Sequence, residues 1–194
     1  MKGYVFITSS GYDPSQGKHV KDPYLGAKPT LGGCMPNIRR LVVPGDHIFV
    51  VSGKVKGLQQ YLFANFEVEE KINALAAYKK YPDLRLQKRE DGQLTGNVIV
   101  DARGRQHPLD GHDKLNPAKF ERRIENYVVG CNLVALTAPE EVQRGRDESL
   151  PILRTVLRRE GSSPLKVMGR WSKLDGDQVQ ELRQWLISLK TGRH

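Results

Sequence analysis

The sequence has only two cysteines, Cys34 and Cys131, among its 194 residues. Two cysteines cannot build the disulfide framework of a small secreted domain, and free thiols are typical of a reducing compartment. No apolar run approaches the roughly 20 residues of a membrane-spanning helix. The apolar run near the N-terminus is also too short for the core of a secretory signal. We therefore expect a cytoplasmic protein with no membrane partner.

The short motifs that mark common enzyme classes are absent as well. The sequence contains no GxxxxGK[ST], GxGxxG, HExxH or GxSxG pattern. Its five histidines are scattered singly, and metal-ligand residue types crowd only in HPLDGHD, between His107 and Asp113. The proline and the glycine of that stretch indicate a loop rather than the rigid element that usually carries metal ligands. We expect no metal, no cofactor and no catalytic residue.

Positive charge is in clear excess. The chain carries 31 Lys and Arg against 22 Asp and Glu, a formal net charge of +9. The excess is not a basic tail, because residues 1–100 hold 14 basic and 9 acidic residues and residues 101–194 hold 17 and 13. An anionic partner is therefore favoured, with nucleic acid as the leading candidate. The alternative is that the charge only keeps the surface soluble.

The predicted strands lie in the first two thirds of the chain. Period-2 alternation and β-branched or aromatic residues predict strands at 3–9, 47–52, 58–68, 97–101 and 127–136. The second and third of these are joined by a glycine-rich turn and form a hairpin. Residues 10–33 hold so many glycines and prolines that we expect a long loop, and long loops in compact domains are often functional.

Helices are predicted by apolar period and by capping residues. Residues 69–81 show a helical period that Pro82 ends, and a short helix is expected to start at Pro36. Asn116 and Ser149 are in position to cap two further helices. The last helix is the best specified, because Asp175 and Gln178 form a capping box before an apolar stripe. The stripe consists of Val179, Leu182, Trp185, Leu186 and Leu189.

Strands separated by helices, without the regular βαβ rhythm, predict an α+β fold. We expect a small curved mixed sheet or β-barrel of about five strands with helices around it. The whole chain, residues 1–194, is expected to form one domain with a helical C-terminal extension from about residue 145.

The most specific feature lies between Thr30 and Asp46. It contains a glycine pair, then Arg39 and Arg40, then a Gly-Asp turn that leads into a strand. From residue 14 to residue 56 there are seven Lys or Arg and no Glu. Glycine-rich backbone exposes N–H groups, and paired arginines supply planar donors for a phosphate or a base edge. The two arginines could equally be solvated or cap a short helix.

These residues resemble a known family. The pattern runs from Tyr12-Asp13-Pro14 through Thr30-Leu31, Cys34, Pro36 and Ile38-Arg39 to Gly45-Asp46 and the two hairpin strands. It is similar to the nucleotide modification associated domain family, second type, of phage and bacterial DNA-modification genes. The hairpin also resembles the wider PUA-like group, which includes the ASCH, EVE and YTH domains. The resemblance covers roughly residues 3–70.

The resemblance implies a small β-barrel that binds DNA or RNA and can hold a modified base in an aromatic-lined pocket. Asp13, Thr30, Cys34, Pro36, Arg39 and Asp46 occupy the matching positions, while Met35 stands where the family often has a basic residue. A base pocket needs edge-reading donors and a stacking platform. The residues expected to bind a base are Ser9, Ser10, Tyr12, Asp13, Thr30, Cys34, Arg39, Arg40 and Trp171. A phosphate track is expected at Lys54, Lys56, Arg154 and Arg158.

The sequence thus predicts a nucleic-acid binding module that recognises a modified base or serves a DNA modification or restriction system. One alternative is an enzyme acting on nucleotides or modified bases, with Asp13 or Cys34 as its acid, base or nucleophile. Another is a small-molecule or protein-interaction domain whose charge is incidental. The oligomeric state and the choice between DNA and RNA are open.

Overall fold

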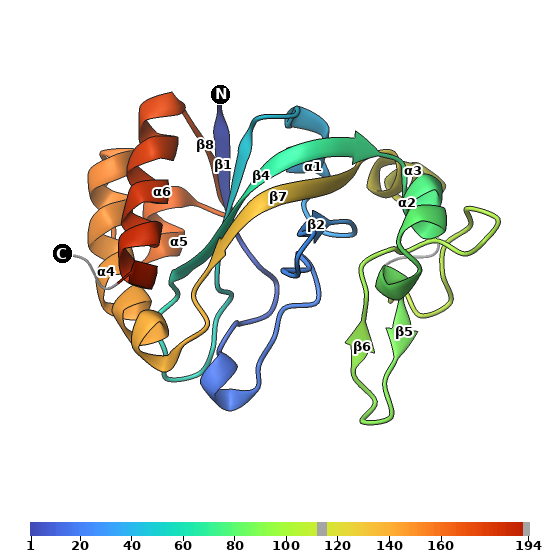
Figure 1. Ribbon diagram of the computed structural model, residues 1–194, viewed down its shortest axis with the longest axis horizontal. Coiled ribbons are helices and arrows are strands. Elements are labelled where there is room, and N and C mark those ends of the chain that lie inside the picture. Colours follow the sequence, from blue (N-terminus) through green and yellow to red (C-terminus); the bar gives the residue numbers. More distant parts are fainter. Residues whose placement is uncertain (112–115, 192–194) are drawn as a thin grey trace. The chain divides into compact units, whose positions relative to one another are not determined.

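The computed structural model describes residues 1–111 and 116–191. The elements follow one another as β1 (Gly3–Ile7), η1 (Pro14–Gln16), β2 (Thr30–Leu31), α1 (Pro36–Leu41), β3 (His47–Val51), β4 (Leu62–Ile72), α2 (Ala74–Lys80), η2 (Pro82–Leu84), β5 (Gln87–Lys88), β6 (Leu94–Thr95), α3 (Pro117–Ile124), β7 (Tyr127–Ala135), α4 (Pro139–Leu157), α5 (Pro164–Met168), β8 (Trp171–Leu174) and α6 (Gly176–Thr191). Figure 1 shows these elements coloured along the chain. They form two compact units, residues 1–20, 45–67 and 132–194, and residues 21–44 and 68–131.

The first unit combines strands with the C-terminal helices. Strand β1 pairs in parallel with β3 and antiparallel with β8. All five residues of β1 and of β3 are buried, as expected for strands rich in β-branched and aromatic residues. In Figure 1, α4, α5 and α6 lie beside β1 and β8. Their apolar faces form one core with the strands, in which Val5, Phe49, Leu153 and Leu182 are buried.

The predicted hairpin is confirmed, with a different second strand. Strand β4 pairs antiparallel with β3, and a register irregularity lies between Val50 and Val51. It begins at Leu62 instead of residue 58 and continues to Ile72. The prediction of helix from residue 69 is therefore wrong for residues 69–72, and α2 starts only at Ala74. Helical and strand periods are hard to separate in a short amphipathic run, and here pairing across the sheet decided.

The second unit has its own core. Strand β2 pairs antiparallel with β7, and β5 pairs with β6 in a separate small hairpin. Ala74, Ala77, Val98 and Tyr127 are buried together in this unit. Residues 97–101 are buried or nearly so but form no strand, only isolated bridges from Val98 and Val100. The predicted strand there is wrong, because an apolar run can be buried without pairing along its length.

Two of the three predicted helix caps are confirmed, and the third is wrong. Asn116 Oδ1 accepts a hydrogen bond from Lys119 N at the start of α3, as predicted. The capping box of α6 is also confirmed, since Asp175 and Gln178 each accept the other's backbone N–H at 3.0 Å. Ser149, in contrast, lies in the interior of α4, which begins at Pro139. Its hydroxyl is engaged in the core, where it accepts a hydrogen bond from Leu62 N.

The α+β class is confirmed. The main sheet is mixed and has six strands in the order β2-β7-β4-β3-β1-β8. The sheet is not closed, so the expected β-barrel is not confirmed. The sixth strand is the short β8, whose exposed and buried residues alternate. Within the described ranges, no helix has both the length and the apolar character that crossing a membrane requires.

Candidate functional site

The residues predicted from the sequence lie in both units. Thr30, Cys34, Arg39 and Arg40 belong to the second unit, and the other predicted residues belong to the first. We therefore describe the two groups in turn.

Arg39 is completely buried and serves the fold of the second unit. Its Nε donates to Cys34 O at 2.7 Å, Nη1 donates to Arg123 O at 2.9 Å and to Asn126 O, and Nη2 donates to Gly33 O at 3.4 Å. Burial lowers the pKa of its guanidinium to about 10, so the group is still charged at neutral pH. With no exposed surface and each of its three nitrogens bonded within the unit, Arg39 cannot reach a base edge. Arg40 is exposed.

The glycine-rich turn of this unit already holds an anion from its own chain. The buried carboxylate of Asp22 accepts N–H bonds from Gly32 and Gly33, both at 2.9 Å, and from Cys34. The side chain of Asn97 donates to the same carboxylate at 2.8 Å. The backbone donors expected to face a ligand are therefore used within the unit. Asp22 was missed because nothing local links it to a turn ten residues later.

Thr30 belongs to the same buried network. Its hydroxyl accepts hydrogen bonds from Asn97 Nδ2 at 2.9 Å and from Tyr127 Oη at 3.1 Å. These three side chains are at most 1 % exposed, so the network stabilises the second unit and offers no surface to a partner.

Cys34 lies beside this network and carries a protonated thiol. Burial, reinforced by the nearby Asp22 carboxylate, raises the pKa of Cys34 to about 12. A nucleophilic cysteine needs a lowered pKa, because the thiolate is the reactive form. The environment of Cys34 has the opposite effect.

In the first unit, Tyr12 is part of the core. Its ring stacks on Phe63 with a centroid distance of 4.2 Å and an interplanar angle of 15°. Its hydroxyl donates to Leu136 O at 3.2 Å, and its own carbonyl accepts from Tyr61 Oη at 3.2 Å. Because one face of the ring is occupied and the residue is buried, Tyr12 is not an open stacking platform.

Asp13, next to Tyr12, forms a buried ion pair with Arg146 of α4. Arg146 Nη2 lies 2.9 Å from Asp13 Oδ1, and Ser15 Oγ donates to the same oxygen at 2.6 Å. Burial of the carboxyl works to raise its pKa, but the Ser15 hydrogen bond and the Arg146 charge together lower the pKa of Asp13 below its usual value. Asp13 is therefore ionised at neutral pH.

The pair retains unused hydrogen-bonding atoms. Asp13 Oδ2 and Arg146 Nε are buried and have no hydrogen-bond partner, whereas Arg146 Nη2 is engaged by Asp13 Oδ1. Arg146 also lines a cavity of about 490 Å³ at the start of α4, together with Ser15, Thr137, Glu140 and Gln143. The polar residues that line this cavity offer both donors and acceptors, as a polar ligand edge or ordered water requires.

Arg146 was missed by the sequence analysis. Val142, Ser149 and Leu153 are buried on one side of α4, and Arg146 falls among them at helical spacing. A charged residue on the apolar side of a helix is the signal that would have found it, once the helix was known to begin at Pro139.

Comparison with protein-family models, with curated proteins and with solved structures finds no match to this chain. Its function must therefore be argued from its own residues.

Four of the predicted residues are exposed in two adjacent loops of the first unit: Ser9, Ser10, Lys54 and Lys56. Gly53 N donates to Ser10 O at 3.2 Å and to Thr8 Oγ1 at 2.8 Å, which ties the lysine loop to the end of β1. A Cβ on Gly53 would lie 2.5 Å from Ser10 O, so only glycine permits this approach. The structure thus groups two predicted serines with two predicted phosphate contacts.

Trp171 is exposed on β8, the strand at one end of the sheet order. The residue is 36 % exposed, and its ring lies tilted against Tyr4 at a centroid distance of 6.3 Å. We call residues 158–173 the basic segment, because this stretch carries five basic residues and one acidic residue, Glu160. Its basic residues, all exposed, are Arg158, Arg159, Lys166, Arg170 and Lys173.

Of the predicted phosphate contacts near this segment, Arg158 is free to serve and Arg154 is not. Arg154 Nε and Nη2 both donate to Gly161 O, which holds the chain that leaves α4. Arg159 Nη1 donates to Ser172 Oγ at 3.1 Å and so connects the same stretch to β8. The basic segment is therefore an ordered surface of the first unit.

Metal-ligand residues gather nowhere in the described ranges: no group of three or more His, Cys, Asp or Glu could hold an ion there. Asp110 of the HPLDGHD stretch pairs with Arg123 instead, at 2.6 Å. His112 and Asp113 lie outside the described residues.

Proposed function

We propose that the protein binds nucleic acid through the basic segment, with Trp171 as the stacking platform. The exposure of Trp171 in a segment whose five basic residues are also exposed is the observation that carries the proposal. Aromatic rings stack on unpaired bases, and Lys and Arg neutralise the adjacent phosphates, so such a surface suits single-stranded or locally unpaired nucleic acid.

The recognition of a modified base is a finer part of the same proposal. It is supported by the cavity beside Arg146. That cavity has the size of a small-molecule pocket, and its guanidinium is held in place by Asp13. Arg146 would donate to acceptors on the base, while Ser15 and Gln143 would select among substituents. That the protein serves a DNA modification or restriction system stays a prediction from the sequence.

The alternative of an enzyme receives less support. The thiol of Cys34 is protonated because its pKa is raised to about 12. Asp13 remains a candidate base only for a group that reaches the cavity beside Arg146.

The test is a binding assay by fluorescence anisotropy with single-stranded DNA and RNA oligonucleotides, each with and without modified bases. Trp171→Ala is expected to weaken binding by about 1–3 kcal/mol, because one stacking contact is lost. Trp171→Phe should retain most of the affinity, since it keeps a ring.

Leu94→Ala serves as the control, because Leu94 is an exposed apolar residue of the other unit. It is expected to bind like the unaltered protein. Full affinity in Trp171→Ala, or no binding of any oligonucleotide, would refute the proposal.

A further inference from the structure

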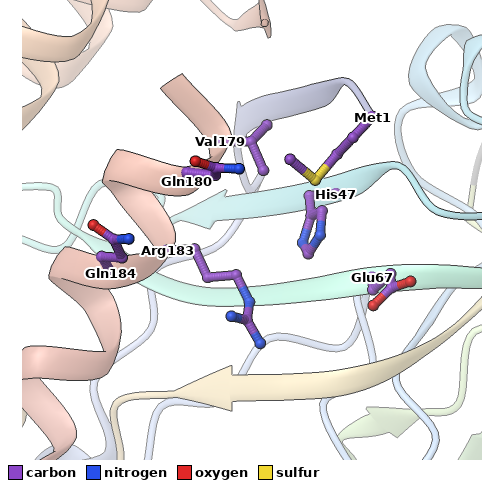
Figure 2. Close-up of a pocket in the computed structure, with 7 residues that line it drawn as sticks. All are labelled: Met1, His47, Glu67, Val179, Gln180, Arg183 and Gln184. Carbon is purple, nitrogen blue, oxygen red and sulfur yellow. The ribbon is translucent and has the colours of Figure 1, made fainter. Parts of the chain in front are cut away.

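We propose that the first unit has a second binding site, for a small zwitterion that carries a carboxylate and an ammonium group, as an α-amino acid does. The site is an open cavity of about 340 Å³ to which α6, β3 and β4 contribute. Figure 2 shows its polar side chains, with Arg183 from α6, His47 from β3 and Glu67 from β4. The proposal is independent of nucleic-acid binding, because it uses none of the residues of the basic segment.

Arg183 is the first element of the site. It is half-buried, and its Nε is buried without a hydrogen-bond partner. In Figure 2 its side chain extends from α6 toward the strands. A buried guanidinium donor that no protein group satisfies is costly. A carboxylate bound in the cavity would pair with the Arg183 guanidinium, because its two oxygens match the geometry of guanidinium donors.

His47 is the second element and presents an acceptor. Its side chain is buried, and Nδ1 lies 3.4 Å from Asn65 Oδ1. Asn65 Nδ2 also lies 3.4 Å from Nδ1 and donates to Ile48 O at 3.1 Å. In the tautomer whose Nδ1 donates to Asn65 Oδ1, Nε2 is the unprotonated nitrogen of His47 and can accept from a ligand. Burial also lowers the pKa of His47, which favours the neutral ring at neutral pH.

Glu67 is the third element and supplies negative charge. Its Oε2 accepts from Asn132 Nδ2 at 2.8 Å, which orients the carboxylate and leaves Oε1 available. One cavity thus offers a cation on α6, and an anion and a neutral acceptor on the strands. An ammonium group donates three hydrogen bonds and complements Glu67 and His47, while the carboxylate complements Arg183.

The charges also discriminate among ligands. A phosphate would meet one guanidinium but would be repelled by Glu67, and a cation would be repelled by Arg183. A zwitterion gains from both charges. The cavity size admits a small amino acid and excludes a long peptide chain from full burial.

The experiment is isothermal titration of the full chain with L-alanine, L-serine and L-glutamine. The matched ligands are N-acetyl-L-alanine, which lacks the ammonium, L-alaninamide, which lacks the carboxylate, and inorganic phosphate. At least one amino acid is expected to bind with a dissociation constant of about 1 mM or tighter, and the matched ligands at least about tenfold more weakly.

Two variants locate the site. Arg183→Gln and Glu67→Gln are each expected to weaken amino-acid binding at least about tenfold, with circular dichroism confirming that both are folded. Arg103→Gln, which changes an exposed arginine of the other unit, is the control and should bind like the unaltered chain. If Arg183→Gln does not fold, Arg183→Lys is measured in its place, alongside Glu67→Gln. The proposal is overturned if no amino acid binds, if a matched ligand binds as tightly, or if the folded variants retain full affinity.

Discussion

At the scale of single residues, Arg39 shows how a side chain suited to recognition can instead serve the fold. A guanidinium that donates only to backbone carbonyls of its own unit stabilises the segments that carry them, here residues 33–34 and 123–126. The price of such burial is desolvation, which the hydrogen bonds offset.

Arg39→Met is therefore expected to lower the free energy of unfolding by about 3 kcal/mol or more, because it leaves several buried carbonyls without donors. Urea denaturation followed by circular dichroism measures this change. The folded variant should keep its nucleic-acid affinity. A loss of affinity without a loss of stability would show that Arg39 contributes to nucleic-acid binding.

His47 makes stability depend on pH. Burial is the main cause that lowers its pKa below the ordinary 6.5, and Arg183 adds to it, against smaller opposing effects of Asn65, Glu67 and Asp46. On acidification the unfolded chain binds the proton first, so the contribution of His47 is complete above pH 6.5 and is lost as the pH falls through the lower folded pKa.

The free energy of unfolding is thus expected to fall between about pH 7.5 and pH 5.5, and His47→Gln should reduce that fall. Urea titrations of both proteins at the two pH values measure the difference. An identical pH dependence in the variant would contradict the assignment.

At the scale of elements, the end of α4 combines strain and charge. Arg158 is the C-cap of this helix and has φ 51°, in the left-handed region that favours glycine. Arg158→Gly is expected to raise the free energy of unfolding by about 0.5–1 kcal/mol, because it relieves the backbone. The same change removes a cation of the basic segment and should weaken nucleic-acid binding.

The opposite signs make this variant informative, since ordinary destabilisation cannot produce them. Thermal unfolding and fluorescence anisotropy on one preparation give both quantities. Arg159→Gly, whose residue is not the cap, serves for comparison. Lower stability together with unchanged affinity would contradict both parts of the prediction.

At the scale of the whole molecule, the net charge of +9 predicts how binding responds to salt. If all five cations of the basic segment contact phosphates, the logarithm of the affinity for a single strand falls with a slope of about −3.5 on the logarithm of salt concentration. Affinity should then drop about 100-fold between about 50 and 200 mM salt. Anisotropy titrations at four salt concentrations measure the slope. A slope near zero would mean that the charge has no part in binding.

Parts of this fold follow from local pattern. Strand β1, strand β3 and the capped helix α6 were predicted because their signals lie within a few residues of each other. The start of α4 was not predicted, because Ser149 satisfies the local rule for an N-cap. Only the packed structure shows that the Ser149 hydroxyl accepts a hydrogen bond from Leu62 N inside the helix. Residues 69–72 were misassigned because strand pairing outweighed a weak helical period.

The candidate site was predicted less well than the fold. Asp13, Trp171 and Arg158 remain candidates, whereas Arg39 and Thr30 are buried in structural networks. Arg146 lines the cavity and pairs with Asp13. Its role could not be predicted before the extent of its helix was known.

The sequence alone determined the α+β class, the positive charge and the best-capped helix of this protein. These depend on composition and on neighbours along the chain. Only the tertiary structure decided that Asp22 fills the glycine turn, that Arg146 meets Asp13, and that Trp171 remains exposed on β8. Burial and pairing between distant residues set the role of a polar side chain, and no local pattern encodes them.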